Sequence, residues 1–155
     1  MSRKFQVKTV PSSWIEKQAR RLDCGPYMSG AMEARELLGN LRAKKDHLQD
    51  LTEGGISGII NAGRITRLWI ETPEHGYRFL SSTDISQNDL RTVPYIAKSA
   101  GTQNRHLLIK ENWTLITRSG SVGKMAYART DMSGMACTED VLRIIPNRSL
   151  VPPGY

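Results

Sequence analysis

The stretch that decides the fold is residues 107–147, LLIKENWTLITRSGSVGKMAYARTDMSGMACTEDVLRIIPN. Within it, residues 113–117 combine β-branched and aromatic side chains, which suit a pleated and half-buried surface. The RSGSVG segment that follows contains two glycines, which tolerate positive φ and favour a turn. Residues 122–129 then alternate imperfectly, and residues 141–145 form a short apolar run before Pro146. We therefore predict a strand, a tight turn, a second strand, a loop and a third strand, with a polar, basic tip on the hairpin.

The N-terminal part of the chain has the pattern of helices. Ser13 and Glu16 have the spacing of a capping box, which predicts a helix over residues 14–22 with Ser13 as its N-cap. Ser29 can cap a second helix over residues 31–48, in which four leucines lie near one face. That face either packs on the domain or docks a partner helix. The leucines are Leu37, Leu38, Leu41 and Leu48.

Between these helices and the hairpin, short β-type runs alternate with turn signals. The runs are residues 56–60, 64–70, 77–81 and 95–97. The first two flank a turn signal at residues 61–63, and the polar residues 82–89 and 98–106 read as a connector and a basic loop. The expected fold is α+β, with N-terminal helices (residues 1–50) packed on a mixed, mostly antiparallel and curved β-sheet (residues 56–147).

The composition is basic, which suits an acidic partner. The chain has 155 residues, enough for one domain with its own core. Its 22 Lys and Arg against 15 Asp and Glu give a net charge of +7, which permits binding to nucleic acid. The charges are spread along the sequence, so folding must assemble any basic patch. Cys24 and Cys137 lie far apart and show no metal-ligand spacing, which favours free thiols over a disulfide or a metal site.

The sequence shows neither the pattern of a secretory signal nor that of a membrane span. The N-terminal residues lack the apolar core of a secretory signal. No apolar run approaches the ~18 residues that a membrane span needs. We therefore expect a cytoplasmic protein with no membrane partner.

Three groups of residues carry a resemblance to a known family. Residues 111–129, ENWTLITRSGSVGKMAYAR, are followed by TEDVLRIIPN at residues 138–147. Arg21-Leu22-Asp23 with Tyr27 lies upstream, and YRFL at residues 77–80 precedes Thr83-Asp84-Ile85. Together, over residues 21–155, these motifs resemble the target recognition domain of specificity subunits from type I restriction-modification systems.

The resemblance implies sequence-specific recognition of double-stranded DNA without catalysis. The implied partners are double-stranded DNA, methyltransferase (modification) subunits and a restriction subunit, and no cofactor is implied. In that family, a segment like residues 148–155 leads into a further helix, and the full subunit has a second recognition domain and two long spacer helices. We therefore expect a single target recognition domain that is truncated at its C-terminal end, either as a fragment or as the product of a split gene.

DNA recognition needs two kinds of contact, to phosphates and to bases. Lysine and arginine neutralise phosphates, whereas side chains on loops and strand ends read base edges, with Arg suited to guanine and Asn or Gln to adenine. The candidates around the hairpin are Arg118, Ser119, Gly120, Ser121, Lys124, Tyr127 and Arg129. The second group of candidates consists of Arg64, Arg67, Arg78, Lys98 and Arg105.

Sequence motifs for catalysis are missing. No lysine has Asp or Glu two residues before it, as a common metal-dependent nuclease core requires. Residues 151–154, VPPG, lack the polar leader and aromatic follower of an adenine methyltransferase motif. The P-loop, HExxH and GxSxG patterns are also absent, and His47, His75 and His106 have no local arrangement that suggests a triad. We therefore predict a non-catalytic protein. Two alternatives stay open, a protein-interaction module and an RNA-binding domain.

Overall fold

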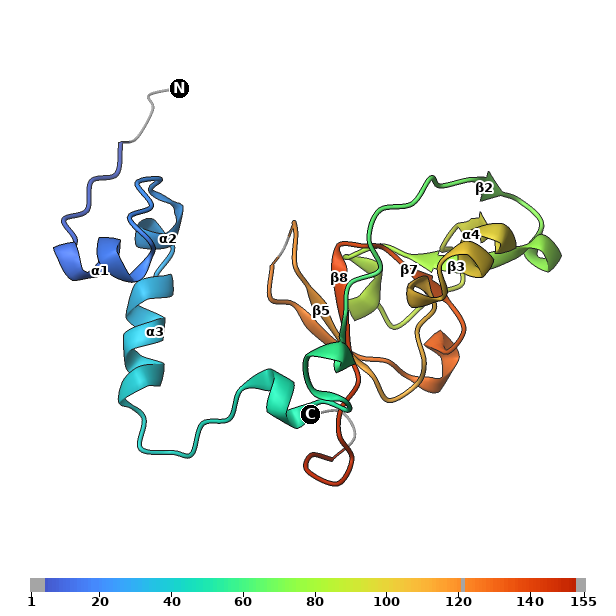
Figure 1. The fold of residues 1–155 in the computed structure, drawn as a ribbon. Coiled ribbons are helices and arrows are strands. Elements are labelled where there is room, and N and C mark those ends of the chain that lie inside the picture. The colour runs from blue at the N-terminus through green and yellow to red at the C-terminus, as the bar shows by residue number, and fades with distance from the viewer. Residues whose placement is uncertain (1–4, 121, 153–155) are drawn as a thin grey trace. The chain divides into compact units, whose positions relative to one another are not determined.

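The computed structural model describes residues 5–120 and 122–152 and divides the chain into two compact units, residues 1–45 and residues 46–155. The first unit is helical and the second is mainly β (Figure 1). This agrees with the predicted α+β class. None of the described helices is long and apolar enough to cross a membrane.

The first unit contains three short helices. They are α1 (Ser12–Lys17), α2 (Gly25–Met28) and α3 (Ala31–Asn40). Trp14, Tyr27 and Met32, one from each helix, are buried and pack together as its small core. The Trp14 indole N–H donates to the Glu36 carboxylate at 2.7 Å. An apolar cluster and a hydrogen bond between α1 and α3 therefore join the helices.

Both predicted helices end earlier than expected. The first stops at Lys17 because Ala19 and Arg20 adopt positive φ angles of 50° and 58°. Its N-cap is Pro11, without a side-chain cap, and Glu16 pairs with Arg20 instead of closing a capping box. The predicted capping box is therefore wrong.

The second predicted helix, α3, ends at Asn40 and not at residue 48. Leu41 is extended, and Lys45 reaches back so that its ammonium group donates to the Leu38 and Gly39 carbonyls at 3.0 and 2.7 Å. A cation at this position satisfies carbonyls that the helix leaves free. The leucines of the expected apolar face are exposed, at 71% for Leu37 and 60% for Leu38. The expectation that this face is packed is not met.

Two four-stranded sheets form the second unit, and neither is closed or curled. The first sheet has the order β1-β8-β5-β6, with all neighbours antiparallel. Its strands are β1 (Ile59–Ile60), β5 (Thr114–Thr117), β6 (Met125–Tyr127) and β8 (Val141–Ile144). This sheet contains the predicted hairpin and third strand.

The second sheet has the order β2-β4-β3-β7 and contains the only parallel pair among the described strands, β3 with β7. Its strands are β2 (Trp69–Ile70), β3 (Gly76–Leu80), β4 (Tyr95–Ala97) and β7 (Ala136–Cys137). Short helices precede β1 or connect the strands. They are η1 (Leu48–Leu51), η2 (Gly55–Gly58), η3 (Pro73–His75), η4 (Asp84–Ser86), α4 (Lys98–Gln103), η5 (Arg105–Leu107) and η6 (Thr130–Met132).

The β3–β7 pair separates two hydrophobic clusters. Phe79 pairs with Ala136, and both belong to a cluster with Ile96. Leu80 pairs with Cys137, and both belong to the larger cluster on the other side. Successive residues of a strand point to opposite faces. The two neighbouring residue pairs of β3 and β7 therefore contribute side chains to the two different clusters.

The expectation of one curved sheet is therefore wrong. The predicted strands at residues 56–60 and 64–70 do not pair with each other, because Ile59 pairs with Ile144 in the first sheet and Trp69 pairs with Ile96 in the second. The chain between them passes from one sheet to the other. Residues 98–106, expected as a loop, form α4 and η5.

Candidate nucleic-acid interface

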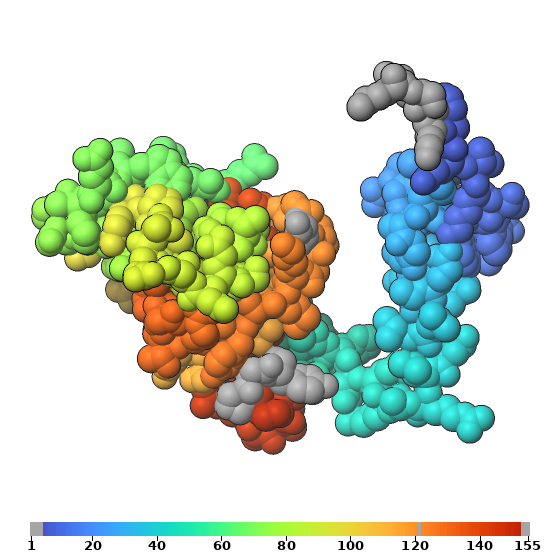
Figure 2. Space-filling model, turned by 180° about the vertical axis from the view of Figure 1, so that it is seen from behind, coloured from blue at the N-terminus to red at the C-terminus, as the bar shows by residue number. Residues whose placement is uncertain are grey.

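The β5–β6 hairpin exposes a loop of seven residues, 118–124, in place of the predicted tight turn. The two glycines adopt positive φ angles, 71° at Gly120 and 83° at Gly123, as the sequence predicted. The Gly123 N–H donates to the Thr117 carbonyl at 2.9 Å and closes the loop. Val122 is 71% exposed and Lys124 is also exposed. The loop lies at the surface of the unit, where its orange atoms are visible in Figure 2.

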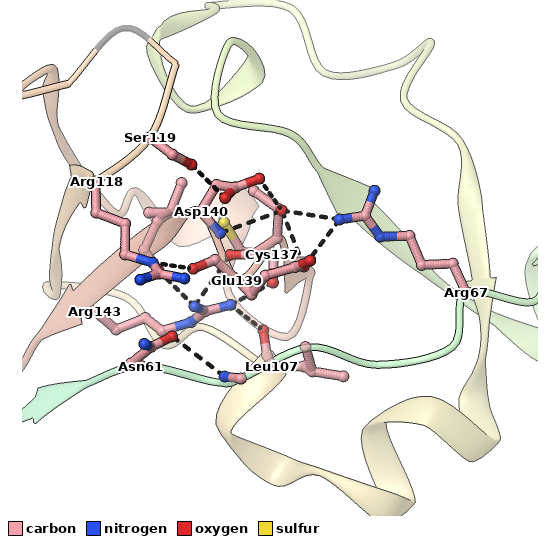
Figure 3. Close-up of polar contacts among 12 residues, drawn as sticks. Asn61, Arg67, Leu107, Arg118, Ser119, Cys137, Glu139, Asp140 and Arg143 are labelled. Atoms are coloured by element: carbon pink, nitrogen blue, oxygen red, sulfur yellow. Dashed lines mark hydrogen bonds and ion pairs between the residues drawn. The ribbon is translucent and has the colours of Figure 1, made fainter.

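The base of this loop is clamped to residues 138–140, which connect β7 and β8 (Figure 3). The Arg118 Nε donates to the Glu139 carbonyl at 2.9 Å, and the Arg118 backbone N–H donates to the Asp140 carbonyl at 2.8 Å. The Ser119 hydroxyl donates to the Asp140 carboxylate. That hydroxyl is the main cause that lowers the pKa of Asp140, with help from Thr138 and the charge of Arg118. Arg118 and Ser119 are therefore anchors of the loop.

Arg67, two residues before β2, reaches the same connection. Its Nη2 lies 2.9 Å from the Glu139 carboxylate and 3.2 Å from the Thr138 hydroxyl, and its guanidinium lies over the Phe79 ring at 5.1 Å. Burial opposes the Glu139 charge, but a backbone N–H and Arg67 outweigh it and lower the pKa of Glu139. The cation is paired with a carboxylate that is only 12% exposed, so Arg67 is poorly placed to neutralise a phosphate.

Arg143 lies under the clamp and is 0% exposed. Its guanidinium donates to four carbonyls, those of Val141 at 2.6 Å, Thr138 at 3.2 Å, Leu107 at 3.3 Å and Cys137 (Figure 3). Burial lowers the pKa of this group. Arg143 therefore fixes the backbone of the β7–β8 connection from inside the unit.

Sequence reasoning missed Arg143 and its surroundings. The run VLRII was interpreted as a purely apolar strand, and no role was given to the Thr-Glu-Asp segment that precedes it. The available signal was an arginine in the middle of an apolar strand. Such a residue is rarely buried unless most of its donors have partners. Here Nη1 and Nη2 donate to carbonyls, whereas the buried Nε has no partner among the described residues.

Three other predicted contacts also have partners within the unit. Arg129 pairs with Asp131 at 2.9 Å and donates to the Gln87 carbonyl at 3.2 Å. The Tyr127 hydroxyl donates to the Asn112 side chain. Arg78 lies 3.4 Å from the Tyr95 hydroxyl. These contacts brace loops and strands, so the side chains are less available to DNA than the sequence suggested.

The remaining predicted cations do not gather in one place. Within residues 5–120 and 122–152, the side chains of Arg64, Lys98, Arg105 and Lys124 form no hydrogen bond or ion pair. Lys124 follows the C-terminal end of β5, whereas Arg105 belongs to η5, well before the N-terminal end of that strand. Ser121 lies outside the described residues. Of the twelve candidates, Lys124 is thus the charged side chain that is both at the exposed loop and unpaired in the described part of the chain.

The boundary between the units also divides the net charge. Residues 1–45 contain ten Lys and Arg and four Asp and Glu, whereas residues 46–155 contain twelve and eleven. Most of the net charge of +7 therefore belongs to the helical unit, which the sequence alone did not reveal. Arg35 and Arg42 there have no ion pair among the described residues.

The two cysteines are free, with Cys24 exposed and Cys137 buried. Burial is the main cause that raises the pKa of Cys137 to about 11. Within the described ranges, no three His, Cys, Asp or Glu side chains are grouped to hold a metal ion.

No protein-family model matches the chain, and no curated protein matches it significantly, so the resemblance seen in the sequence stays a prediction.

Proposed function

We propose that the chain recognises double-stranded DNA in a sequence-specific manner, as a target-recognition-domain-like component of a type I specificity subunit. The observation that carries this proposal is the loop at residues 118–124. It is clamped at its base and presents Lys124, which has no side-chain partner among the described residues, directly after the exposed Gly123. A loop fixed in this way can enter a groove without losing much conformational entropy on binding. The sequence motifs around the loop are those that resemble the family.

The proposed contacts are divided between the two units. Lys124 and the exposed glycine-bearing backbone of the loop meet the DNA at the target site. Arg35, Arg42 and their neighbours in the helical unit neutralise phosphates, because that unit has the larger excess of positive charge. Each phosphate contact releases counterions and adds about 0.9 to the slope of log affinity against log salt. Arg118, Ser119 and Arg67 serve the site by positioning the loop.

Catalysis is assigned to partners in this proposal. The chain requires no cofactor of its own, and methylation and cleavage reside in methyltransferase and restriction subunits. Incubation of the purified chain with duplex DNA, Mg²⁺ and S-adenosylmethionine tests this assignment. Methyl transfer or cleavage above the blank would contradict it.

The loop is tested by comparing Lys124→Ala with Arg91→Ala in salt-dependent gel shifts on duplex DNA. Both variants remove one positive charge, but Arg91 is exposed, paired with Asp89 at 2.7 Å and not part of the loop. We expect Lys124→Ala to reduce the salt slope by about one unit and Arg91→Ala to leave it unchanged. Equal slopes for both variants and the unmodified chain would exclude the loop from the interface. Preferential binding of single-stranded RNA would favour an RNA-binding domain instead.

A protein-interaction role is the second candidate, and the leucines of α3 favour it. Leu37 and Leu38 are 71% and 60% exposed, and Leu41, directly after the helix, is 53% exposed. Exposed apolar groups of this kind are typical of docking surfaces. Replacement of Leu37 and Leu38 by Lys should abolish binding of a methyltransferase subunit in light scattering while DNA binding by the isolated chain persists. If the double variant still binds the methyltransferase subunit, the leucines do not form this docking surface.

A further inference from the structure

A hollow of about 540 Å³ opens in the second unit at the other end of β5 from the loop. Trp113, which lines it, directly precedes β5, whereas the loop directly follows it. A strand of four residues separates the two places by roughly 13 Å. The hollow is therefore a distinct place on the unit, and a ligand bound there is independent of the role proposed for the loop.

Five of the ten residues that line this hollow are aromatic or basic, and three others are aliphatic. Tyr77 and Trp113 contribute two aromatic rings, and Arg105, His106 and Lys110 contribute basic groups. Among the described lining residues none is acidic. In the described part of the chain, the functional groups of these five side chains form no hydrogen bond or ion pair. This contrasts with the clamp, where each arginine has a partner.

The aromatic wall is held in place by a close contact with α4. A Cβ atom at Gly101 would lie 2.6 Å from Cε2 of Tyr77, so the ring occupies the space that any side chain there would take. Glycine inside a helix costs about 1 kcal/mol relative to alanine, and this contact gives it a structural reason. Trp113 is held as well, because it packs against the larger hydrophobic cluster and its carbonyl accepts from the Ala128 N–H at 2.8 Å.

We propose that this hollow binds a nucleoside phosphate, either as a free nucleotide or as an unstacked nucleotide of a single strand. An aromatic face stacks a base of any sequence, and arginine and lysine neutralise its phosphate. The volume lies within the range of small-molecule sites. An acidic peptide would use the cations but would leave the two rings without a matching flat group, so the nucleotide fits the lining better.

Calorimetry on the full chain at low salt tests the proposal with three probes: adenosine monophosphate, a short single-stranded oligodeoxynucleotide and a short polyglutamate peptide. We expect the nucleotide or the oligonucleotide to bind, and the peptide to bind more weakly. Binding of both nucleotide probes indicates that a free nucleotide suffices. Binding of the oligonucleotide alone indicates a nucleotide within a strand. Failure of both, or a peptide that binds as tightly, would overturn the proposal.

Matched double variants locate the binding. Arg105→Ala with Lys110→Ala removes two cations of the hollow, and Arg20→Ala with Arg91→Ala removes two exposed cations outside its lining. We expect about tenfold weaker binding from the first pair and less than about twofold from the second. Equal effects of the two pairs would show that only net charge matters and would refute the site.

A third readout does not depend on affinity. Ultraviolet crosslinking of a bromouracil-containing oligonucleotide, mapped by mass spectrometry, should mark Tyr77 or Trp113. Gly101→Ala should reduce this crosslink, because the added methyl group displaces the Tyr77 ring. Crosslinks confined to other residues would place the ligand elsewhere and refute the proposal. Lys124→Ala should leave the crosslink intact, so failure of the loop hypothesis and failure of this one are distinguishable.

Discussion

Replacing Arg143 by Met should destabilise the second unit, because the guanidinium is buried and satisfies four carbonyls. A hydrogen bond from a charged donor contributes ~1.5 kcal/mol at the low end, so four bonds amount to about 6 kcal/mol. Removing a buried charge returns roughly 3 kcal/mol of desolvation energy. We therefore expect the free energy of unfolding to fall by about 3 kcal/mol.

Urea denaturation followed by tryptophan fluorescence measures this loss. A Trp14→Phe background leaves Trp69 and Trp113 as reporters, and both belong to the second unit. Arg91→Met is the control, because its ion pair with Asp89 is exposed to solvent and its loss should leave the urea midpoint almost unchanged. If Arg143→Met is as stable as the background, the desolvation cost of the buried arginine equals its hydrogen-bond gain, and the reasoning is refuted.

Three further predictions concern the loop clamp and the thiols. Gly123→Val should lower the free energy of unfolding by about 1–2 kcal/mol, and Gly123→Asn should lower it by less. The reason is that φ is 83° at this position and asparagine tolerates that region better than valine. Equal urea midpoints for the two variants would contradict this. Asp140 has a lowered pKa in the folded protein, so its contribution is present above its ordinary pKa of about 4 and is lost as the pH falls through the lower folded value. The urea midpoint should therefore decrease more steeply below about pH 4 in the unmodified chain than in Asp140→Asn, and parallel curves would argue against the clamp. Iodoacetamide should alkylate Cys24 in the native chain but leave Cys137 unmodified, because Cys137 is buried with a pKa of about 11; mass spectrometry that finds equal modification would contradict the described core.

The clamp changes how the candidate residues are divided. Arg118 and Lys124 looked equivalent in the sequence, since each lies beside the glycine-bearing turn. In the structure, Arg118 is tied to the Glu139 carbonyl, whereas Lys124 has no side-chain partner among the described residues. A charge deletion at Arg118 therefore tests the position of the loop, and one at Lys124 tests a contact.

The sequence by itself determined the local β pattern of this protein. The runs at residues 77–81, 95–97, 113–117 and 141–145 correspond to β3, β4, β5 and β8, and both glycines of the loop adopt positive φ. These features depend on near neighbours along the chain, namely alternation, β-branched side chains and glycine. The helix ends were wrong because positive φ at Ala19 and Arg20, and the reach of Lys45 back to α3, are not encoded in helical periodicity.

Only the tertiary structure decided which strands share a sheet and which cations remain available. The pairing of Ile59 with Ile144 joins residues from distant parts of the chain, and turn signals specify no such partner. The arginines at 67, 118 and 143 all converge on residues 137–140, two of them from outside and one from beneath. A sequence records that these residues are charged, but their role depends on which carboxylates and carbonyls folding brings within about 3 Å. Packing over the whole unit sets these distances. They distinguish the arginines that hold the loop in place from Lys124, which the loop exposes.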